Sequence, residues 1–405
     1  MHVSRYLAGV IVLLAMGMVL TGSAQPSLSA AAAETSSTAK IASVVRSFMV
    51  QNHLKAVIVQ VRSNGSDVYS GAFGDSMTGV PPTPDMHFRN GALAFTYMST
   101  LLLEFVDQKK VTLQTKLSNY FPDLPNANRI TLKDLLQMTS GYADYVYQPE
   151  LIQSLYHDPF RQWTPEELIQ IGTSKPMQFV PGKNWGYSHT NYVILGRVLE
   201  KIADMPLADA LRRYVLQPMG LKQTTASTTP VIPQPALHSF TSERREILGI
   251  KPGVPFYEES TFWNPSWTTI EGAVETTDIS DLNTSLEAVA SGKLLSKASS
   301  AAQIKPSLIG FGHSQSNCPA CRKNSVSFNY GLGVIIAGQW ITQTLGFAGA
   351  SGAVGYLPAQ KLTIAVEATN GPGAYDKEGV AGLGAVAVFR ALANALAPKT
   401  LPPAE

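Results

Sequence analysis

The alternation of apolar and polar residues predicts β-strands near both ends of the chain. Residues 56–61 form an apolar run, Asn64-Gly65 is typical of a two-residue hairpin turn, and residues 68–73 follow as the partner strand. Strand patterns return only in the C-terminal part, at residues 331–337, 342–347, 353–357 and 362–367. The strands at the two ends are therefore expected to share one sheet.

The residues between these strands, from about 92 to 300, are mainly helical in their spacing and include long proline-containing loops. Helical spacing also marks residues 41–54 and 378–396, on the outer sides of the strands. We therefore expect an α/β (α+β) fold, in which an antiparallel sheet is flanked by helices and joined to a mainly helical subdomain. The cleft between the two parts is the expected site.

The N-terminal segment has the features of a signal peptide. Arg5 precedes an apolar run at residues 7–20, which is short for a membrane span, and small residues suitable for cleavage follow. We expect residues 1–33 to be signal peptide and leader, residues 34–398 to be the folded domain, and residues 399–405 to be a tail. Within the domain, the sheet parts lie at about 40–90 and 328–396 and the helical part at about 91–300.

The N-terminal pattern also predicts where the protein resides. Leu20-Thr21-Gly22-Ser23 is similar to a bacterial lipoprotein box with Ser where the lipidated Cys belongs, so no thioether to lipid can form. We expect an exported protein, periplasmic, secreted or at the cell envelope, with a cleaved signal peptide and no transmembrane domain in the mature chain. An uncleaved anchor is the alternative.

Composition narrows the classes of function. Apolar residues make up 45% of the 405 residues and charged residues only 15%, as suits an exported globular protein. The net charge is +2 and no basic run occurs, which argues against nucleic-acid binding. The histidines and carboxylates show no metal-ligand spacing, and we expect neither metal nor cofactor.

The two cysteines, Cys318 and Cys321, lie in a loop rich in Gly, Ser and Asn. A structural disulfide in an oxidising compartment is the favoured interpretation. A thioredoxin-like redox site has the same spacing but needs the first Cys at a helix N-terminus. A zinc site would use His313 and lacks a further ligand.

The most informative segment reads Phe88-Arg89-Asn90-Gly91-Ala92-Leu93-Ala94-Phe95. It resembles the Phe-Arg-x-Gly-Ser-x-x-Lys segment of the serine β-lactamase / penicillin-binding-protein family, which includes class C β-lactamase-related and D-Ala-D-Ala carboxypeptidase-like proteins. Further landmarks follow in that family's order, at residues 116–122, 130–141, 179–196, 330–333 and 346–349. The resemblance spans residues 40–395 and implies a β-lactamase/transpeptidase-like fold.

The resemblance implies that the catalytic side chains have been replaced. Ala92 stands at the position of the nucleophilic Ser, and Phe95 at that of the Lys that helps to deprotonate it. In the family's Tyr-x-Asn motif, Tyr187 is retained and His189 replaces the Asn that binds the substrate amide. A methyl group cannot attack a carbonyl, and a phenyl ring cannot accept a proton.

The family's third motif, Lys/His-Thr/Ser-Gly on an inner strand, is expected at Phe347-Ala348-Gly349, where only the Gly is kept. By the same resemblance, the two backbone N–H groups of the oxyanion hole belong to Ala92 and Ala350. Main-chain donors survive side-chain substitution, and a helix N-terminus at Ala92 would favour an anion. Two interpretations stay open: a cleft that holds a carboxylate or carbonyl, or one plugged by Phe95 and Phe347.

Other side chains could carry different chemistry. Ser188 or Ser351 could pair with His189 as a relocated nucleophile, although a turn or packing role is favoured for both. Ser37-Thr38-Ala39-Lys40 is the one Ser-x-x-Lys in the chain and lies before the predicted core. The aromatic residues Phe262, Trp263 and Trp267 are expected to pack under a long loop, with a ligand groove as the alternative.

We therefore expect an exported, catalytically inactive homologue of the serine hydrolases that acts as a binding protein at the cell envelope. The expected partner is a peptidoglycan-related or small carboxylate ligand, or an envelope protein. The alternatives are an active hydrolase with a relocated nucleophile and a thiol–disulfide protein acting through Cys318 and Cys321.

Overall fold

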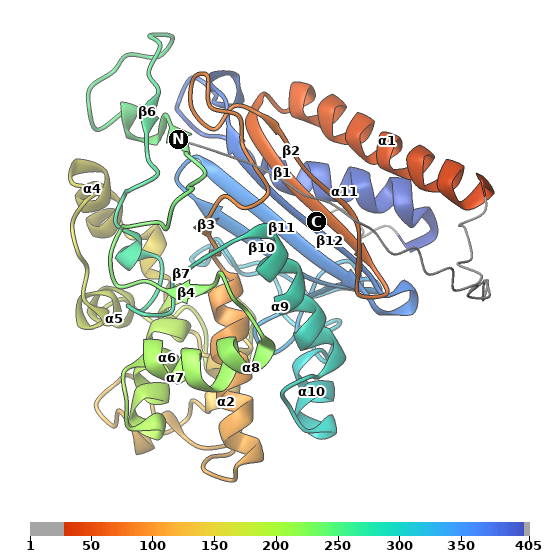
Figure 1. Ribbon diagram of the computed structural model, residues 1–405. Helices are drawn as coiled ribbons and strands as arrows, with labels where there is room; N and C mark the ends of the chain where they lie inside the picture. The colour runs from red at the N-terminus through yellow and green to blue at the C-terminus, as the bar shows by residue number, and fades with distance from the viewer. Residues whose placement is uncertain (1–27, 401–405) are drawn as a thin grey trace, which may run out of the picture.

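The computed structural model describes residues 28–400, with side chains from residue 37 onward. A seven-stranded antiparallel sheet in the order β2-β1-β12-β11-β10-β9-β8 forms its centre (Figure 1). Its strands are β1 (Leu54–Ser63), β2 (Ser66–Gly74), β8 (Asn329–Tyr330), β9 (Ile335–Ala337), β10 (Trp340–Phe347), β11 (Ala350–Leu357) and β12 (Leu362–Asn370). The N-terminal hairpin joins the C-terminal strands through the β1–β12 pair, which confirms the predicted sheet.

The hairpin between β1 and β2 follows from its two turn residues. Asn64 and Gly65 both have positive φ, at 52° and 78°, as a tight hairpin turn of matching twist requires. Strand β1 is buried on both faces, because Val57 and Val59 pack toward one core cluster while Ala56 and Ile58 pack toward the other. This explains why its sequence is an apolar run without alternation.

Helices α1 (Leu28–Gln51) and α11 (Gly384–Leu396) cover one face of the sheet, and α9 (Ile279–Ser291) packs on the other (Figure 1). The predicted last helix begins later than residue 378. A bridge between Tyr375 and Ala381 and a positive φ of 87° at Gly379 hold that segment in a turn. Gly384 then begins the helix, close to Leu54 of β1.

The central part of the chain is mainly helical, as expected, with short strands that the periodicity did not predict. Its helices are α2 (Leu93–Asp107), α3 (Leu132–Leu136), α4 (Pro149–His157), α5 (Pro165–Thr173), α6 (His189–Ala203), α7 (Leu207–Leu211), α8 (Gln217–Met219) and α10 (Lys297–Gln303). The short strands are β3 (Phe88–Arg89), β4 (Thr225–Ala226), β5 (Phe240–Thr241), β6 (Glu258–Glu259) and β7 (Glu275–Thr277). They form two small sheets, β3-β7-β4 and β5-β6.

One predicted strand, residues 331–337, is divided in the structure. Gly333 has a φ of 74°, and the turn around it separates β8 from β9. The predicted signal peptide lies almost wholly outside the described residues. Within residues 28–400, no helix is long and apolar enough to cross a membrane.

The structure joins Cys318 and Cys321 in a disulfide, with their Cα atoms 5.3 Å apart. Both side chains are buried, and Cys321 forms a β-bridge with Gly186. A methyl group added to Gly186 would lie 2.9 and 3.0 Å from the two sulfur atoms, so the disulfide packs directly on the segment that leads to Tyr187. The disulfide is therefore a packing contact for the backbone next to Tyr187.

We predict that the native protein contains no free thiol. Titration with a thiol reagent in denaturant should find none before reduction and two per chain after it, because the only cysteines are Cys318 and Cys321. Two reactive thiols in protein purified without reductant would contradict a structural disulfide.

Candidate functional site

A cleft of about 280 Å³ lies between the sheet and the helical part, at the start of α2. It is lined by Gly91, Ala92, Phe95, Tyr187, His189, Trp267, Thr268, Thr269, Thr344, Leu345, Gly346 and Leu383. The structure thus brings together four residues predicted from the first two motifs. The cleft is open, and Phe95 forms part of its wall rather than closing it.

The turn that presents Ala92 is fixed by a buried polar pair. The Asn90 amide donates a 2.6 Å hydrogen bond to the Glu275 carboxyl, and the backbone N–H of Glu275 donates to the Asn90 side-chain oxygen at 3.2 Å. Strand pairing of β3 with β7 holds the same segment. Burial raises the pKa of Glu275 well above its ordinary value. The Asn90–Glu275 hydrogen bonds lie immediately before Gly91, whose positive φ of 50° turns the chain into α2.

Ala92 occupies the N-cap of α2 and makes no side-chain cap. The N–H groups of Leu93, Ala94 and Phe95 each donate to the carbonyl oxygen three residues earlier, at 3.1 Å. Within the described residues, no hydrogen bond uses the N–H of Ala92 itself. The start of α2 therefore presents this one backbone donor, and the partial positive charge of a helix N-terminus, to the cleft.

Phe95 is the centre of an aromatic cluster under the cleft. Its ring stacks on Tyr192 with centroids 4.0 Å apart and contacts the His189 and Tyr187 rings at 5.5 and 5.9 Å. Phe95 is 2% exposed. An apolar ring in this position is stable where a lone buried ammonium group would be costly.

His189 begins helix α6 and forms an ion pair or hydrogen bond with a buried carboxylate. Its Nδ1 atom lies 3.0 Å from Oδ2 of Asp144, whose side chain is 1% exposed, whereas the His189 side chain is 25% exposed. The other Asp144 oxygen accepts from the backbone N–H of Val146. Asp144 is thus a fixed acceptor that orients the imidazole ring toward the cleft.

Tyr187 lies between Phe95, His189 and Tyr330, at ring distances of 5.9, 5.3 and 6.0 Å. Burial is the main cause that raises its pKa well above the ordinary value, and the neighbouring Tyr330 and Asp144 act in the same direction. The hydroxyl therefore remains protonated at neutral pH. It can donate or accept a hydrogen bond, but it is not a base there.

The residues predicted for the third motif lie outside the lining of this cleft. Phe347, Ala348 and Gly349 do not line the cleft; Ala348 and Gly349 form the two-residue turn between β10 and β11, and Phe347 packs with Ala348 against Trp263. Gly349 has a φ of 84° and lies against the backbone of Phe240, so it serves the turn. The strand that lines the cleft is the preceding part of β10, residues 344–346.

Ala350, the second predicted oxyanion-hole donor, also lies outside the lining of this cleft. Ala350 pairs with Phe347 across the turn, which directs its backbone into the hairpin. In an antiparallel ladder, hydrogen-bonded and non-hydrogen-bonded pairs alternate, so the next pair, Gly346 with Ser351, leaves the Gly346 N–H pointing away from β11. On that side β9 pairs only with residues 340–342, and no strand covers Gly346.

Gly346 lies directly beside the start of α2. A methyl group added to Gly91 would lie 3.1 Å from the backbone nitrogen of Gly346 and 3.0 Å from Cα of Leu345. The N–H groups of Ala92 and Gly346 are therefore the two main-chain donors that the structure brings together at the cleft. With Gly346 as the residue that follows the third motif, Gln343 and Thr344 occupy the first two positions of that motif. The Gln343 side chain bonds to Thr96 and Gly333, and Thr344 is the next residue of β10 along the cleft.

The two serines considered as relocated nucleophiles are not placed for that role. Ser188 is fully buried, and its hydroxyl has no hydrogen-bond partner among the described residues. Ser351 is 2% exposed, accepts a hydrogen bond from the backbone of Ala385, and lines a neighbouring pocket rather than the cleft. Neither serine hydroxyl bonds to the imidazole of His189.

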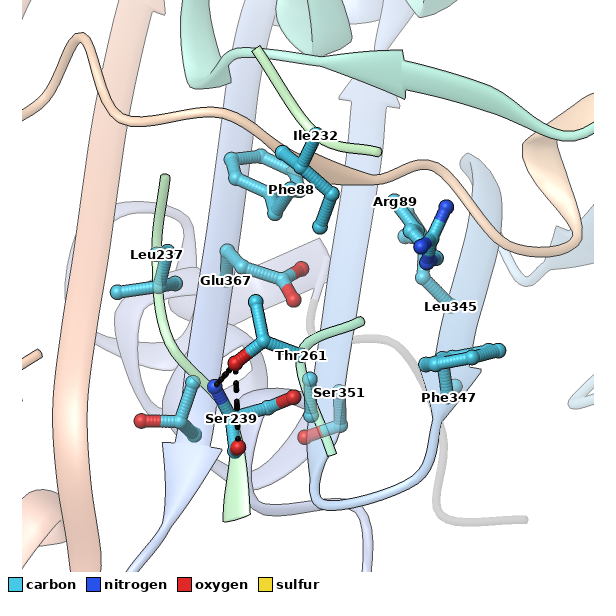
Figure 2. Close-up of a pocket in the computed structure, with 13 residues that line it drawn as sticks. Phe88, Arg89, Ile232, Leu237, Ser239, Thr261, Leu345, Phe347, Ser351 and Glu367 are labelled. Carbon is cyan, nitrogen blue, oxygen red and sulfur yellow. Dashed lines mark hydrogen bonds between the residues drawn. The ribbon is translucent and has the colours of Figure 1, made fainter. Parts of the chain in front are cut away.

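The neighbouring pocket is small and is lined by apolar and polar side chains (Figure 2). It shares Leu345 and Gly346 with the cleft and has room for about one water molecule, at about 20 Å³. Buried polar atoms without a partner among the described residues line it, from Arg89, Glu367 and Thr369. Burial raises the pKa of the Glu367 carboxyl well above its ordinary value.

Asp144, Thr344 and Gly346 are site residues that the sequence reasoning did not identify. Asp144 follows the Thr-Ser-Gly landmark at residues 139–141 by three positions, which was a usable signal. Gly346 was part of a recognised landmark, but the motif was placed on the later Gly. Of the aromatic group, Trp267 lines the cleft, Trp263 is buried and Phe262 is exposed.

Comparison with known proteins agrees with this geometry. The family model described as Beta-lactamase matches residues 41–387. Penicillin-binding protein 4 of Amycolatopsis lactamdurans is 30% identical over 153 residues, which cover 36% of this chain and 38% of that protein. The chain spans less than half the length of this and the other first curated relatives that it matches.

Two solved structures show the same fold over nearly their whole length. D-amino acid amidase from Ochrobactrum anthropi SV3 has a TM-score of 0.73 at 19% identity, covering 89% of this chain and 98% of that chain. D-stereospecific amidohydrolase from a Streptomyces species has a TM-score of 0.69 at 20% identity, covering 91% and 98%. At these identities the likeness concerns the fold alone.

Replacing the buried Glu367 by Gln should stabilise the protein increasingly as the pH rises. The folded chain keeps the Glu367 proton above the ordinary carboxyl pKa whereas the unfolded chain releases it, so wild-type stability falls over this range. We expect Glu367→Gln to raise the free energy of unfolding by roughly 1–3 kcal/mol at pH 7.5, with little gain near pH 4.5. Urea unfolding at both pH values, with the exposed Glu271→Gln as control, checks this; equal effects at both would contradict it.

Proposed function

Because the chain belongs to the Beta-lactamase family, we propose that it is an exported member that binds a ligand in the cleft and does not perform serine-dependent hydrolysis. The observation that carries the proposal is the N-cap of α2, where Ala92 stands with Phe95 one turn later. A methyl group has no lone pair to attack a carbonyl. A ring stacked on Tyr192 cannot take a proton from a neighbour.

The ligand class follows from the donors that remain. The N–H groups of Ala92 and Gly346 and the start of helix α2 favour an oxygen that carries negative charge, as in a carboxylate or a polarised carbonyl. The His189 ring adds a further polar contact at the same cleft. Such a site suits a small carboxylate or the C-terminal end of a D-amino-acid peptide.

Two further observations support a peptidoglycan-related ligand at the cell envelope. Relatives at low coverage include penicillin-binding proteins, and solved neighbours include an amidase named for D-amino acids. The charged Arg5 followed by the apolar run at residues 7–20 supports export. An envelope protein that presents such a peptide end would fit the same cleft.

We expect no covalent adduct when the protein is incubated with a fluorescent penicillin or a fluorophosphonate. Intact-protein mass spectrometry checks this, because an activated serine would gain a stoichiometric adduct. An adduct would overturn the proposed function, and the labelled peptide would identify the nucleophile.

Acetyl-D-Ala-D-Ala should bind reversibly, and its affinity should depend on the Gly346 N–H. Gly346→Pro deletes this donor without breaking a ladder hydrogen bond, whereas Gly346→Ala keeps it and adds a methyl group 3.8 Å from Leu383. We expect calorimetry to show affinity at least tenfold weaker for the Pro variant and little changed for the Ala variant. Equal affinities in the two variants would exclude this donor from the binding site.

Restoring the two lost catalytic residues should not restore acylation. In Ala92→Ser with Phe95→Lys, the new ammonium group would be buried beside Tyr192, and the cleft would still carry His189 where the relatives have an amide. We expect no penicillin adduct and a melting temperature below that of the single Ala92→Ser control. Rapid labelling at position 92 of the double variant would show that only the nucleophile and its base were missing.

A further inference from the structure

The pair formed by His189 and Asp144 has the arrangement of a general base. Asp144 is buried, and its two oxygens accept hydrogen bonds from the Val146 backbone and the His189 ring. A carboxylate that accepts from Nδ1–H fixes the neutral imidazole in the tautomer whose Nε2 carries the lone pair. No described residue bonds to Nε2, and His189 lines the cleft.

The ring of His189 is also held in orientation by its neighbours. Phe95 and Tyr187 meet it edge to face, at centroid distances of 5.5 and 5.3 Å. The titratable side chains that face it are Asp144, Tyr145 and Tyr187, and burial keeps both tyrosines protonated at neutral pH. Asp144 is thus the one charged group that contacts the ring.

The same cleft also contains donors for the oxyanion that forms when a carbonyl is attacked. The N–H groups of Ala92 and Gly346 are free to stabilise a developing oxyanion, and Ala92 leaves open the position where the relatives carry a nucleophilic side chain. The volume of about 280 Å³ accommodates a small acyl group together with a water molecule. No serine hydroxyl of the cleft competes for the imidazole.

We propose that His189, positioned by Asp144, activates a water molecule, so that the cleft hydrolyses small carboxylic esters by direct attack without an acyl-enzyme. The water oxygen bonds to the carbonyl carbon while its proton passes to Nε2 of His189. The carbonyl oxygen takes the negative charge beside the N–H groups of Ala92 and Gly346. The tetrahedral intermediate then collapses, the bond to the leaving alcohol oxygen breaks, and His189 returns the proton to that oxygen.

This activity goes beyond the proposed function, which concerns ligand capture and the absence of serine acylation. The proposed function rests on Ala92 and Phe95, whereas the ester hydrolysis rests on His189 and Asp144. A penicillin or fluorophosphonate adduct would overturn the proposed function. Such an adduct would not test the role of the His189 imidazole, which the variants described next test.

The test is hydrolysis of p-nitrophenyl acetate by the wild-type protein and by His189→Gln, Asp144→Asn and Ser188→Ala, purified in parallel. General-base catalysis contributes about 10²–10⁴-fold, so kcat should fall by about that factor in His189→Gln. Ser188→Ala removes a buried, unpartnered hydroxyl and should keep the wild-type rate. Thermal melting of each variant identifies any loss that comes from unfolding.

Asp144 is a positioning residue, and its variant needs a readout that a merely structural role would not change. In Asp144→Asn the amide can donate to Nδ1, which moves the ring proton to Nε2 and removes the base. We expect a similar fall in kcat, a smaller change in KM, and a pH profile of kcat that differs from that of the wild type. Intact mass during wild-type turnover should show no acetylated protein.

Three outcomes would overturn the inference. Wild type and folded His189→Gln could hydrolyse the ester at equal rates, which would make the imidazole irrelevant. Asp144→Asn could keep the wild-type rate and pH profile, which would remove the orienting carboxylate from the mechanism. An acetyl group on His189 during turnover would show that the ring attacks the ester itself rather than activating water.

Discussion

The contact between the start of helix α2 and strand β10 is the constraint on which the rest of the cleft depends. Gly91 approaches Leu345 and Gly346 so closely that a methyl group at Gly91 would lie 3.0–3.1 Å from their backbone. The Asn90–Glu275 hydrogen bond and the β3–β7 pairing fix the start of α2, and pairing within the main sheet fixes β10. It sets two backbone N–H groups beside each other whatever side chain occupies position 92.

A scaffold of this kind can keep its shape when its catalytic side chains change. The contact uses backbone atoms and a glycine, so replacing a nucleophile by Ala leaves the helix start in place. The aromatic cluster around Phe95 fills the space beneath with apolar rings and removes the need for a buried ammonium group. The family fold is therefore compatible with Ala at position 92 and Phe at position 95.

The cleft has Ala92 at the position where the family carries its nucleophilic serine. It still has an oriented imidazole, a buried carboxylate and two main-chain donors. The disulfide of Cys318 and Cys321 packs on Gly186, next to Tyr187, and stabilises the segment that carries the imidazole. A cleft that acts on its ligand requires the oriented imidazole and the main-chain donors, whereas a cleft that serves only packing does not.

The sequence by itself determined the fold class, the hairpin at Asn64-Gly65 and the residues of the first two motifs, because apolar periodicity and turn chemistry are local properties. The residues that it assigned to the third motif, 347–349, and to the second donor, Ala350, lie outside the lining of the cleft. Only the tertiary structure decided that Gly346 faces Ala92 and that Asp144 reaches His189. Strand register and contacts between distant segments depend on long-range packing, and a shift of a few residues along β10 changes which backbone group meets the cleft.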